Sequence, residues 1–187
     1  MQRARALTGI VFFVLAFLGG LPRIAEAGEI WLLVDTSEFR LQVMDGDRPV
    51  ATFSDVAIGR NGVTAGKHAQ DAKTPLGEFR VASLKPSQAF HFFVGLNYPN
   101  EAHARQAFDD FRLTPRQYHR IVTAIRKGQT PPQETPIGGY IGIHGVGEGD
   151  AQIHRRFNWT QGCVALTNSQ IDILRSWIKL GTRVVIR

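Results

Sequence analysis

The feature that most constrains the fold is a change in hydrophobic period near the middle of the chain. Up to about residue 96, apolar residues occur in short runs, partly alternating with polar ones, that end at glycine- or asparagine-containing turns. From Pro99 to Gly128 they recur every three to four residues, which is typical of amphipathic helices. The short apolar runs before residue 96 predict strands instead. We therefore expect a β-dominated domain with a helical insertion at about residues 100–128.

Turn and cap residues place the individual elements. Asp45-Gly46-Asp47 and Asn61-Gly62 are turn signals, and residues 63–72 form a polar stretch that is expected to be a loop. Thr114-Pro115 is typical of a helix N-cap and first turn, and Asn168-Ser169 can cap a last helix over residues 170–180. The expected strands are residues 30–34, 39–44, 49–56, 140–143 and 183–186, with a loop leading into a further strand over residues 73–81. The fold class is mixed α+β.

Residues 1–27 have the three parts of a secretory signal peptide. Arg3 and Arg5 make the start positive, residues 7–18 are apolar, and Ala25-Glu26-Ala27 offers a small-residue cleavage site. The apolar run is shorter than the roughly 20 residues of a membrane-spanning helix. We expect cleavage after Ala27, which leaves one domain over residues 28–187 in the periplasm or cell wall. An uncleaved N-terminal anchor is the alternative.

The charge of the chain gives only weak information about partners. The formal net charge is +6, and removal of residues 1–27 takes away three arginines and one glutamate, leaving about +4. No run of lysine and arginine is interleaved with aromatic residues, so nucleic acid is not an expected partner. A mild positive charge suits an anionic polymer outside the cell, such as a bacterial wall.

Cys163 is the only cysteine, although exported proteins usually use cysteines in pairs. It could be a small buried side chain, form an intermolecular disulfide, or be a reactive thiol. His144 ends an expected strand upstream and is the nearest plausible base. The glycine-rich loop at residues 147–150 could bring the two positions together. The residues alone therefore suggest a Cys–His acyl-transfer site as one hypothesis.

The residues just before the cysteine fit this hypothesis. Gly162 allows close backbone approach, so amides near positions 162 and 163 could point at an oxyanion. Thr160 could hold the turn through side-chain hydrogen bonds. The histidines lack the spacing of metal ligands, so no metal or other cofactor is expected.

Ile143-His144-Gly145, followed after a gap by Thr160-Gln161-Gly162-Cys163, resembles the signature of YkuD-type L,D-transpeptidase domains. Residues 74–79 are similar to the strand entry of that family. Residues 95–100, the helical insertion and Trp159-Thr160 resemble its YafK-like branch. The resemblance covers nearly all of residues 28–187. It implies a YkuD-like β-sandwich or barrel with the helical insertion, a C-terminal helix and a final strand.

The resemblance also implies roles for individual residues. Cys163 would attack the carbonyl of the third residue of a peptidoglycan stem peptide, and His144 would be its base. The carbonyl of Gly145 would orient the imidazole, and the amides of Gly162 and Cys163 would stabilise the oxyanion. Resolution of the thioester by an amine gives transpeptidation. Resolution by water gives hydrolysis, for example carboxypeptidase action or release of a wall-anchored lipoprotein. Carbapenem-type inhibitors are expected to acylate Cys163.

Two departures from the family pattern affect the expected substrate contacts. Gln161 stands where many members have histidine, and Ala165 where many have an arginine that binds a substrate carboxylate. Substrate contacts are expected at Thr160, Gln161 and Tyr98, with core packing as the alternative for Tyr98. Arg155 or Arg156 could replace the arginine, or the two could be a solvated pair. These departures also motivate a further hypothesis, a non-catalytic wall-binding module in which Cys163 is merely packed.

Overall fold

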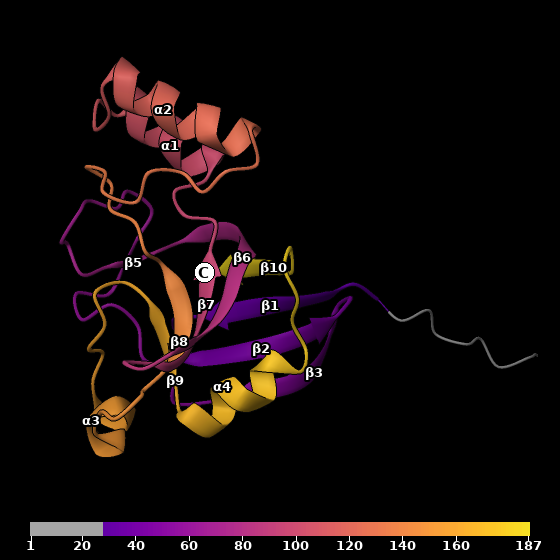
Figure 1. Ribbon diagram of the computed structural model, residues 1–187. Coiled ribbons are helices and arrows are strands. Elements are labelled where there is room, and N and C mark those ends of the chain that lie inside the picture. Colours follow the sequence, from indigo (N-terminus) through magenta and orange to yellow (C-terminus); the bar gives the residue numbers. More distant parts are fainter. Residues whose placement is uncertain (1–27) are drawn as a thin grey trace, which may run out of the picture.

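Eight strands form one mixed sheet in the computed structural model, which describes residues 28–187 (Figure 1). The expected signal peptide and its cleavage site lie outside the described residues. The mainly β architecture with a few helices confirms the expected fold class. In the order β3-β2-β1-β10-β6-β7-β8-β9 the strands are β3 (Arg48–Phe53), β2 (Arg40–Asp45), β1 (Ile30–Asp35), β10 (Arg183–Ile186), β6 (Gly77–Ser87), β7 (His91–Leu96), β8 (Gly142–Gly145) and β9 (Val164–Leu166).

The third strand is shorter than expected, and the segment after it takes another course. β3 ends at Phe53, whereas the sequence pattern predicted a strand to residue 56, and Asp55 has a left-handed backbone with φ 58°. The chain then runs beside β9, where Ala57 and Ala165 exchange two backbone hydrogen bonds of 3.0 and 2.7 Å. Residues 63–72, expected to be a loop, contribute β4 (Val63–Thr64), which pairs with β5 (Thr74–Pro75).

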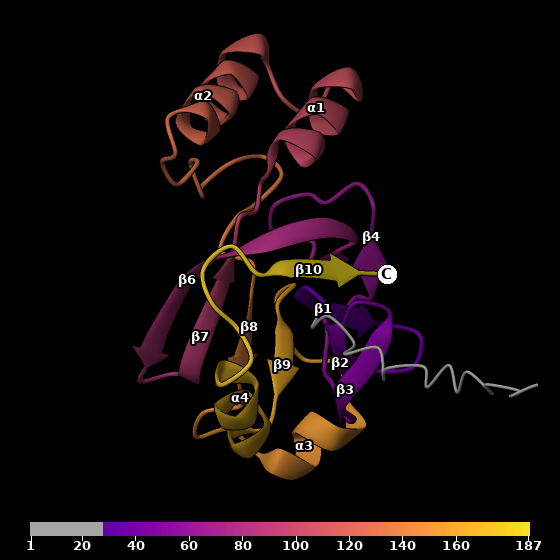
Figure 2. The ribbon, with the colours of Figure 1, turned by 90° about the vertical axis from the view of Figure 1, so that its right-hand side faces the viewer.

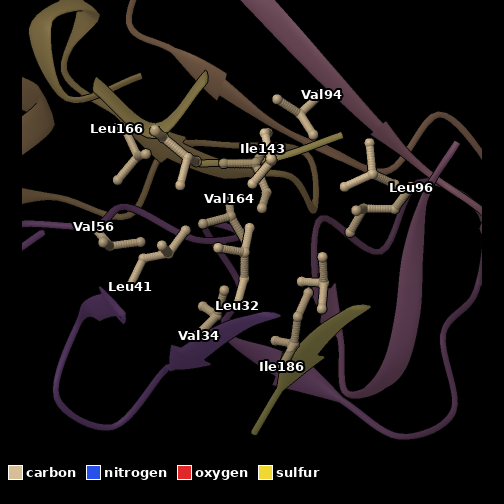
Figure 3. Close-up of a cluster of buried hydrophobic side chains, with 14 of the residues drawn as sticks. Leu32, Val34, Leu41, Val56, Val94, Leu96, Ile143, Val164, Leu166 and Ile186 are labelled. Atoms are coloured by element: carbon tan, nitrogen blue, oxygen red, sulfur yellow. The ribbon is translucent and has the colours of Figure 1, made fainter. Parts of the chain in front are cut away.

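The main core lies between the two halves of the curved sheet. Figure 3 shows Leu32, Val34 and Leu41 from the N-terminal strands pointing toward Ile143 and the side chains of β9. These side chains are fully buried. Burial of one such aliphatic side chain contributes about 1.5–3 kcal/mol. The same packing fixes which face of β8 and β9 turns inward, because successive side chains of a strand point to opposite faces.

The helical insertion is a satellite with its own small core, which confirms the insertion expected at residues 100–128. It consists of α1 (Glu101–Asp109) and α2 (Pro115–Arg126), which stand away from the sheet (Figures 1 and 2). The predicted cap is present: Thr114 and Gln117 form a capping box in front of Pro115. The core of the insertion consists of Ala104, Ala107, Leu113, Ile121 and Ile137.

Two shorter helices flank the C-terminal strands. α4 (Asn168–Arg175) packs Ile171 and Leu174 into the main core beside β7 and β8, and its N-cap is Thr167 rather than the expected Asn168-Ser169. α3 (Ala151–Arg156) was not predicted, because its 6 residues include too few apolar ones to show a period. Within residues 28–187, no helix is both long and apolar enough to cross a membrane.

Two neighbouring positions of α4 test the packing of this helix. Leu174 is fully buried, whereas the side chain of Ile173 is 54% exposed. We expect Leu174→Ala to lower the free energy of unfolding by about 2–5 kcal/mol, through lost apolar contacts and the remaining cavity. Ile173→Ala is the matched control, with an expected change within about 0.5 kcal/mol. Urea unfolding measures both, and equal losses would contradict the described packing.

Candidate active site

Parallel pairing of β8 with β9 brings His144 and Cys163 to the same face of the sheet. His144 pairs with Ala165, so Cys163, just before β9, is level with Gly142. His144 is thus two residues further along the neighbouring strand, about 7 Å in the strand direction. The opposite face carries Ile143 into the core. The structure therefore brings together the two residues that the sequence singled out, on the side away from the core.

The Cys163 thiol is half-buried and unpaired. Its sulfur donates to the carbonyl oxygen of Tyr140 at 3.4 Å. Burial raises the pKa of the thiol to about 11, against the opposing effects of the Gly142 backbone N–H and of the Lys67 charge. At neutral pH the thiol is therefore protonated, and attack on a carbonyl requires a base to remove the proton.

His144 has the properties of such a base. Its Nδ1 lies 2.7 Å from the carbonyl oxygen of Gly145, which only accepts, so Nδ1 carries the proton and Nε2 keeps its lone pair. The imidazole is 2% exposed and packs against Phe90 and Trp159, with ring centroids 4.2 and 5.7 Å away. Burial lowers the pKa of His144, aided by the nearby His154 and opposed by the Gly145 contact. The imidazole is therefore neutral at neutral pH and able to accept a proton.

Asn168 holds the loop that carries the Gly145 carbonyl. Its side chain accepts from the Gly147 amide at 2.9 Å and donates to the Gly147 carbonyl at 2.8 Å. A Cβ atom on Gly145 would lie 2.7 Å from the Asn168 side-chain oxygen and 2.9 Å from the Phe90 carbonyl oxygen, so only glycine fits. The sequence suggested that Asn168 caps a helix, whereas the structure gives it a role in positioning the loop next to His144.

Thr160 closes the turn before the cysteine, as its position suggested. Its hydroxyl donates to the Cys163 carbonyl at 2.6 Å and accepts from the Gly162 amide at 3.1 Å. Gly162 has φ 129°, and a Cβ atom there would lie 2.7 Å from the Lys73 carbonyl oxygen, which explains the glycine.

This turn corrects two expectations. The Gly162 amide is already bonded to the Thr160 hydroxyl and is not free to bind an oxyanion. Of the two amides expected to do so, only that of Cys163 remains a candidate. The buried Thr160 is a residue that shapes the turn and does not line the cavity next to Cys163, so it is not a substrate contact.

A cavity of about 600 Å³ lies beside the Cys163 thiol. Gln161, an expected substrate contact, is exposed and lines it, whereas His144 does not. Within residues 28–187, no group of three or more His, Cys, Asp or Glu side chains is placed to hold a metal ion. The cavity is lined by Lys67, Ala69, Gln70, Gln133, Glu134, Thr135, Pro136, Gly138, Gly139, Tyr140, Ile141, Gln161 and Cys163.

Tyr98 is a core residue, which corrects its assignment as a substrate contact. Its side chain is 1% exposed, and its hydroxyl donates to the Ile137 carbonyl at 2.7 Å. The ring packs against Phe79 with centroids 6.3 Å apart. Tyr98 thus joins the sheet to the helical insertion and does not face the cavity.

The two arginines proposed as carboxylate binders lie elsewhere. Arg155 and Arg156 are on α3 and line a separate cavity of about 290 Å³ together with Asp55. Ala165 is completely buried, between β8 and the segment at Ala57. The basic residue that does line the Cys163 cavity is Lys67, which the sequence analysis missed because residues 63–72 have the composition of a solvated loop.

The family model of the L,D-transpeptidase catalytic domain, YkuD, matches residues 29–186. The chain belongs to this family. Its fold is similar to that of Bd1075 from Bdellovibrio bacteriovorus, with a TM-score of 0.56 and 20% identity over 86% of this chain and 48% of that chain. A search of curated proteins finds no match.

Two further solved structures have the same L,D-transpeptidase fold. The helical cell shape determining protein Pgp2 from Campylobacter jejuni has a TM-score of 0.55 and 19% identity, over 87% of this chain and 48% of that chain. An L,D-transpeptidase from Mycobacterium smegmatis has a TM-score of 0.50 and 9% identity, over 85% of this chain and 58% of that chain. This chain spans about half the length of the solved structures it matches, and at these identities the likeness concerns the fold alone.

The protonation state of this site can be measured through its single cysteine. Below a thiol pKa of about 11, the thiolate fraction increases with pH. We expect the rate of Cys163 alkylation by iodoacetamide to rise about tenfold per pH unit from pH 7 to 10. A small thiol with an ordinary pKa of about 8.5 is the control, and its rate levels off above pH 9. A Cys163 rate that is constant from pH 5 to 8 would instead indicate a thiolate–imidazolium pair.

The Thr160 hydroxyl is expected to contribute measurably to stability. Thr160→Val keeps the shape of the side chain but leaves the buried Gly162 amide without its acceptor, which should lower the free energy of unfolding by about 1–3 kcal/mol. Thr52→Val on β3 is the control, because Thr52 is exposed and makes only a 3.5 Å contact with Gln42. Urea unfolding compares the two variants. A Thr160 effect no larger than that of Thr52 would show that the turn does not need the hydroxyl.

Proposed function

We propose that the protein is a cysteine acyltransferase of peptidoglycan in which Cys163 is the nucleophile and His144 the base. The observation that carries the proposal is the placement of a cavity-lining thiol and a neutral imidazole on the same face of two paired strands. The contact of 2.7 Å between His144 Nδ1 and the Gly145 carbonyl leaves Nε2 as the basic atom. Membership of the L,D-transpeptidase family supports stem peptides as the substrate class.

The proposed reaction proceeds in two acyl-transfer steps. Nε2 of His144 takes the thiol proton as the sulfur attacks the carbonyl carbon of the third residue of the stem. The amide bond to the terminal residue breaks, and its nitrogen leaves with the proton from the imidazolium. A thioester on Cys163 remains. An incoming nucleophile then gives its proton to His144 and attacks the thioester, which breaks the carbon–sulfur bond and restores the thiol. The Cys163 amide is the proposed oxyanion donor.

We propose an amine of a second stem peptide as the acceptor, which makes the reaction a transpeptidation. Water as the acceptor would give hydrolysis at the same site, either trimming a stem or releasing an attached lipoprotein. Carbapenem-type β-lactams enter this proposal as acylating inhibitors of Cys163. Export by a signal peptide at residues 1–27, which would bring the domain to the wall, is part of the same proposal.

Mass spectrometry of tetrapeptide-stem muropeptides incubated with the protein tests the proposal. We expect a new amide in the product, no product with Cys163→Ala, and a rate about 10²–10⁴-fold lower with His144→Gln, because the base is lost. Arg156→Ala is the matched control and should retain the full rate, since Arg156 lines a different cavity. A free carboxyl as the only new product would identify a hydrolase. Muropeptides that bind but remain unchanged, without an acyl adduct on Cys163, would support the wall-binding module instead.

A further inference from the structure

A buried cation lies in the wall of the Cys163 cavity. The side chain of Lys67 is 3% exposed and lines the cavity next to the thiol. Lysine is almost never buried to this extent unless it is paired. Glu134 is the other charged residue of the cavity lining, and it is exposed. Lys67 is therefore the positive group that a bound substrate would meet beside the nucleophile.

The partners of Lys67 leave part of its bonding capacity unused. Nζ donates to Asp71 Oδ1 and, at 2.8 Å, to the Lys73 carbonyl oxygen. An ammonium group has three N–H donors, and within residues 28–187 these are the two acceptors that it contacts. Asp71 is itself held by the amides of His68 and Lys73 at 2.8 and 2.9 Å, so the pair is fixed in place. The third N–H is available for an acceptor in the cavity that Lys67 lines.

The ammonium is close to the reacting centre. A Cβ atom on Gly162 would lie 3.1 Å from Lys67 Nζ, so the cation packs directly against the residue before Cys163. In a peptide attacked by Cys163, the carboxyl carbon of the leaving residue is about 3–3.7 Å from the attacked carbonyl carbon. A terminal carboxylate of a peptide bound at Cys163 would therefore lie in the cavity that Lys67 lines.

We propose that Lys67 binds a carboxylate of the substrate through its remaining N–H and so takes the place of the arginine that is absent at Ala165. The inference rests on the proposed function, which puts a peptide acyl group on Cys163. Two groups share the required chemistry, namely the carboxylate of the terminal leaving residue and the side-chain carboxylate of the diaminoacid whose carbonyl is attacked. Arg155 and Arg156 do not compete for this role, since they line a separate cavity.

Binding measured by calorimetry in a Cys163→Ala background separates recognition from chemistry. Three tetrapeptides serve as ligands: the free acid, the peptide with an amidated C-terminus, and the peptide with an amidated diaminoacid side chain. With Lys67 present, we expect one of the two amidations to weaken binding about tenfold or more, and the sensitive group identifies the carboxylate. Lys67→Met combined with Asp71→Asn removes both charges of the buried pair. This double variant should bind the free acid about tenfold more weakly. It should no longer distinguish the free acid from the amidated peptide that the Lys67 protein binds weakly.

The controls separate recognition from a structural role of Lys67. Arg156→Ala should retain the discrimination, and Lys67→Gln provides a second neutral variant, with thermal unfolding confirming that each protein is folded. Three outcomes would each overturn the inference. The neutral variants could bind all three peptides equally more weakly, or could still distinguish the free acid from the amides as before. The protein with Lys67 could also fail to bind any of the peptides. If discrimination is found but the protein with Cys163 intact does not turn over the free acid, the proposed function fails while the assignment of Lys67 stands.

Discussion

The pairing of β8 with β9 is the interaction on which the site depends. It sets His144 and Cys163 on one face, and it is supported from the outer side by Ala57, which bonds to Ala165 in both directions. The turn at Thr160, which leads into β9, is held in the same way. The backbone of Thr160 is hydrogen-bonded to Ile58 and Arg60, in the segment after Ala57. The nucleophile is thus positioned by backbone contacts on both sides, together with the hydrogen bonds of the Thr160 hydroxyl.

Burial determines the electrostatics of the site. It disfavours the charged form of each group, so it raises the pKa of the Cys163 thiol and lowers that of the His144 imidazole. Both groups are neutral at rest, and charge separation accompanies attack on a substrate. The buried Lys67–Asp71 pair adds a fixed dipole close to the sulfur. A site of this kind protects the thiol from oxidation, because oxidants react with the thiolate.

Local signals in the sequence predicted the elements that depend on nearby residues. The capping residue Thr114, the turn residue Thr160 and the pair of His144 and Cys163 all belong to short motifs, and the structure places each of them in the expected element or turn. Burial depends on contacts far along the chain, and there the sequence was less informative. Tyr98 bonds to a carbonyl in the connector after α2, which a motif does not show.

Lys67 is a second residue whose burial the sequence did not predict, because its surroundings have the composition of an exposed loop. Its pairing with Asp71 is local, at a spacing of four residues, but its burial comes from distant segments. Arg112, in the turn between the two insertion helices, donates to the Lys67 carbonyl at 3.0 Å, and the connector at Gly138 packs against the Lys67 side chain. The helical insertion thus converts a polar loop into part of the cavity wall.

The position of β10 has a consequence for how the chain reaches this state. The final strand inserts between β1 and β6, parallel to the first and antiparallel to the second, so residues from opposite ends of the domain are neighbours in the middle of the sheet. Contacts of such large sequence separation slow folding, because the intervening chain must be ordered first. The pairing of β1 with β6 through β10 cannot form until residues 183–186 are in place. Until then β1 presents an unpaired edge to other chains.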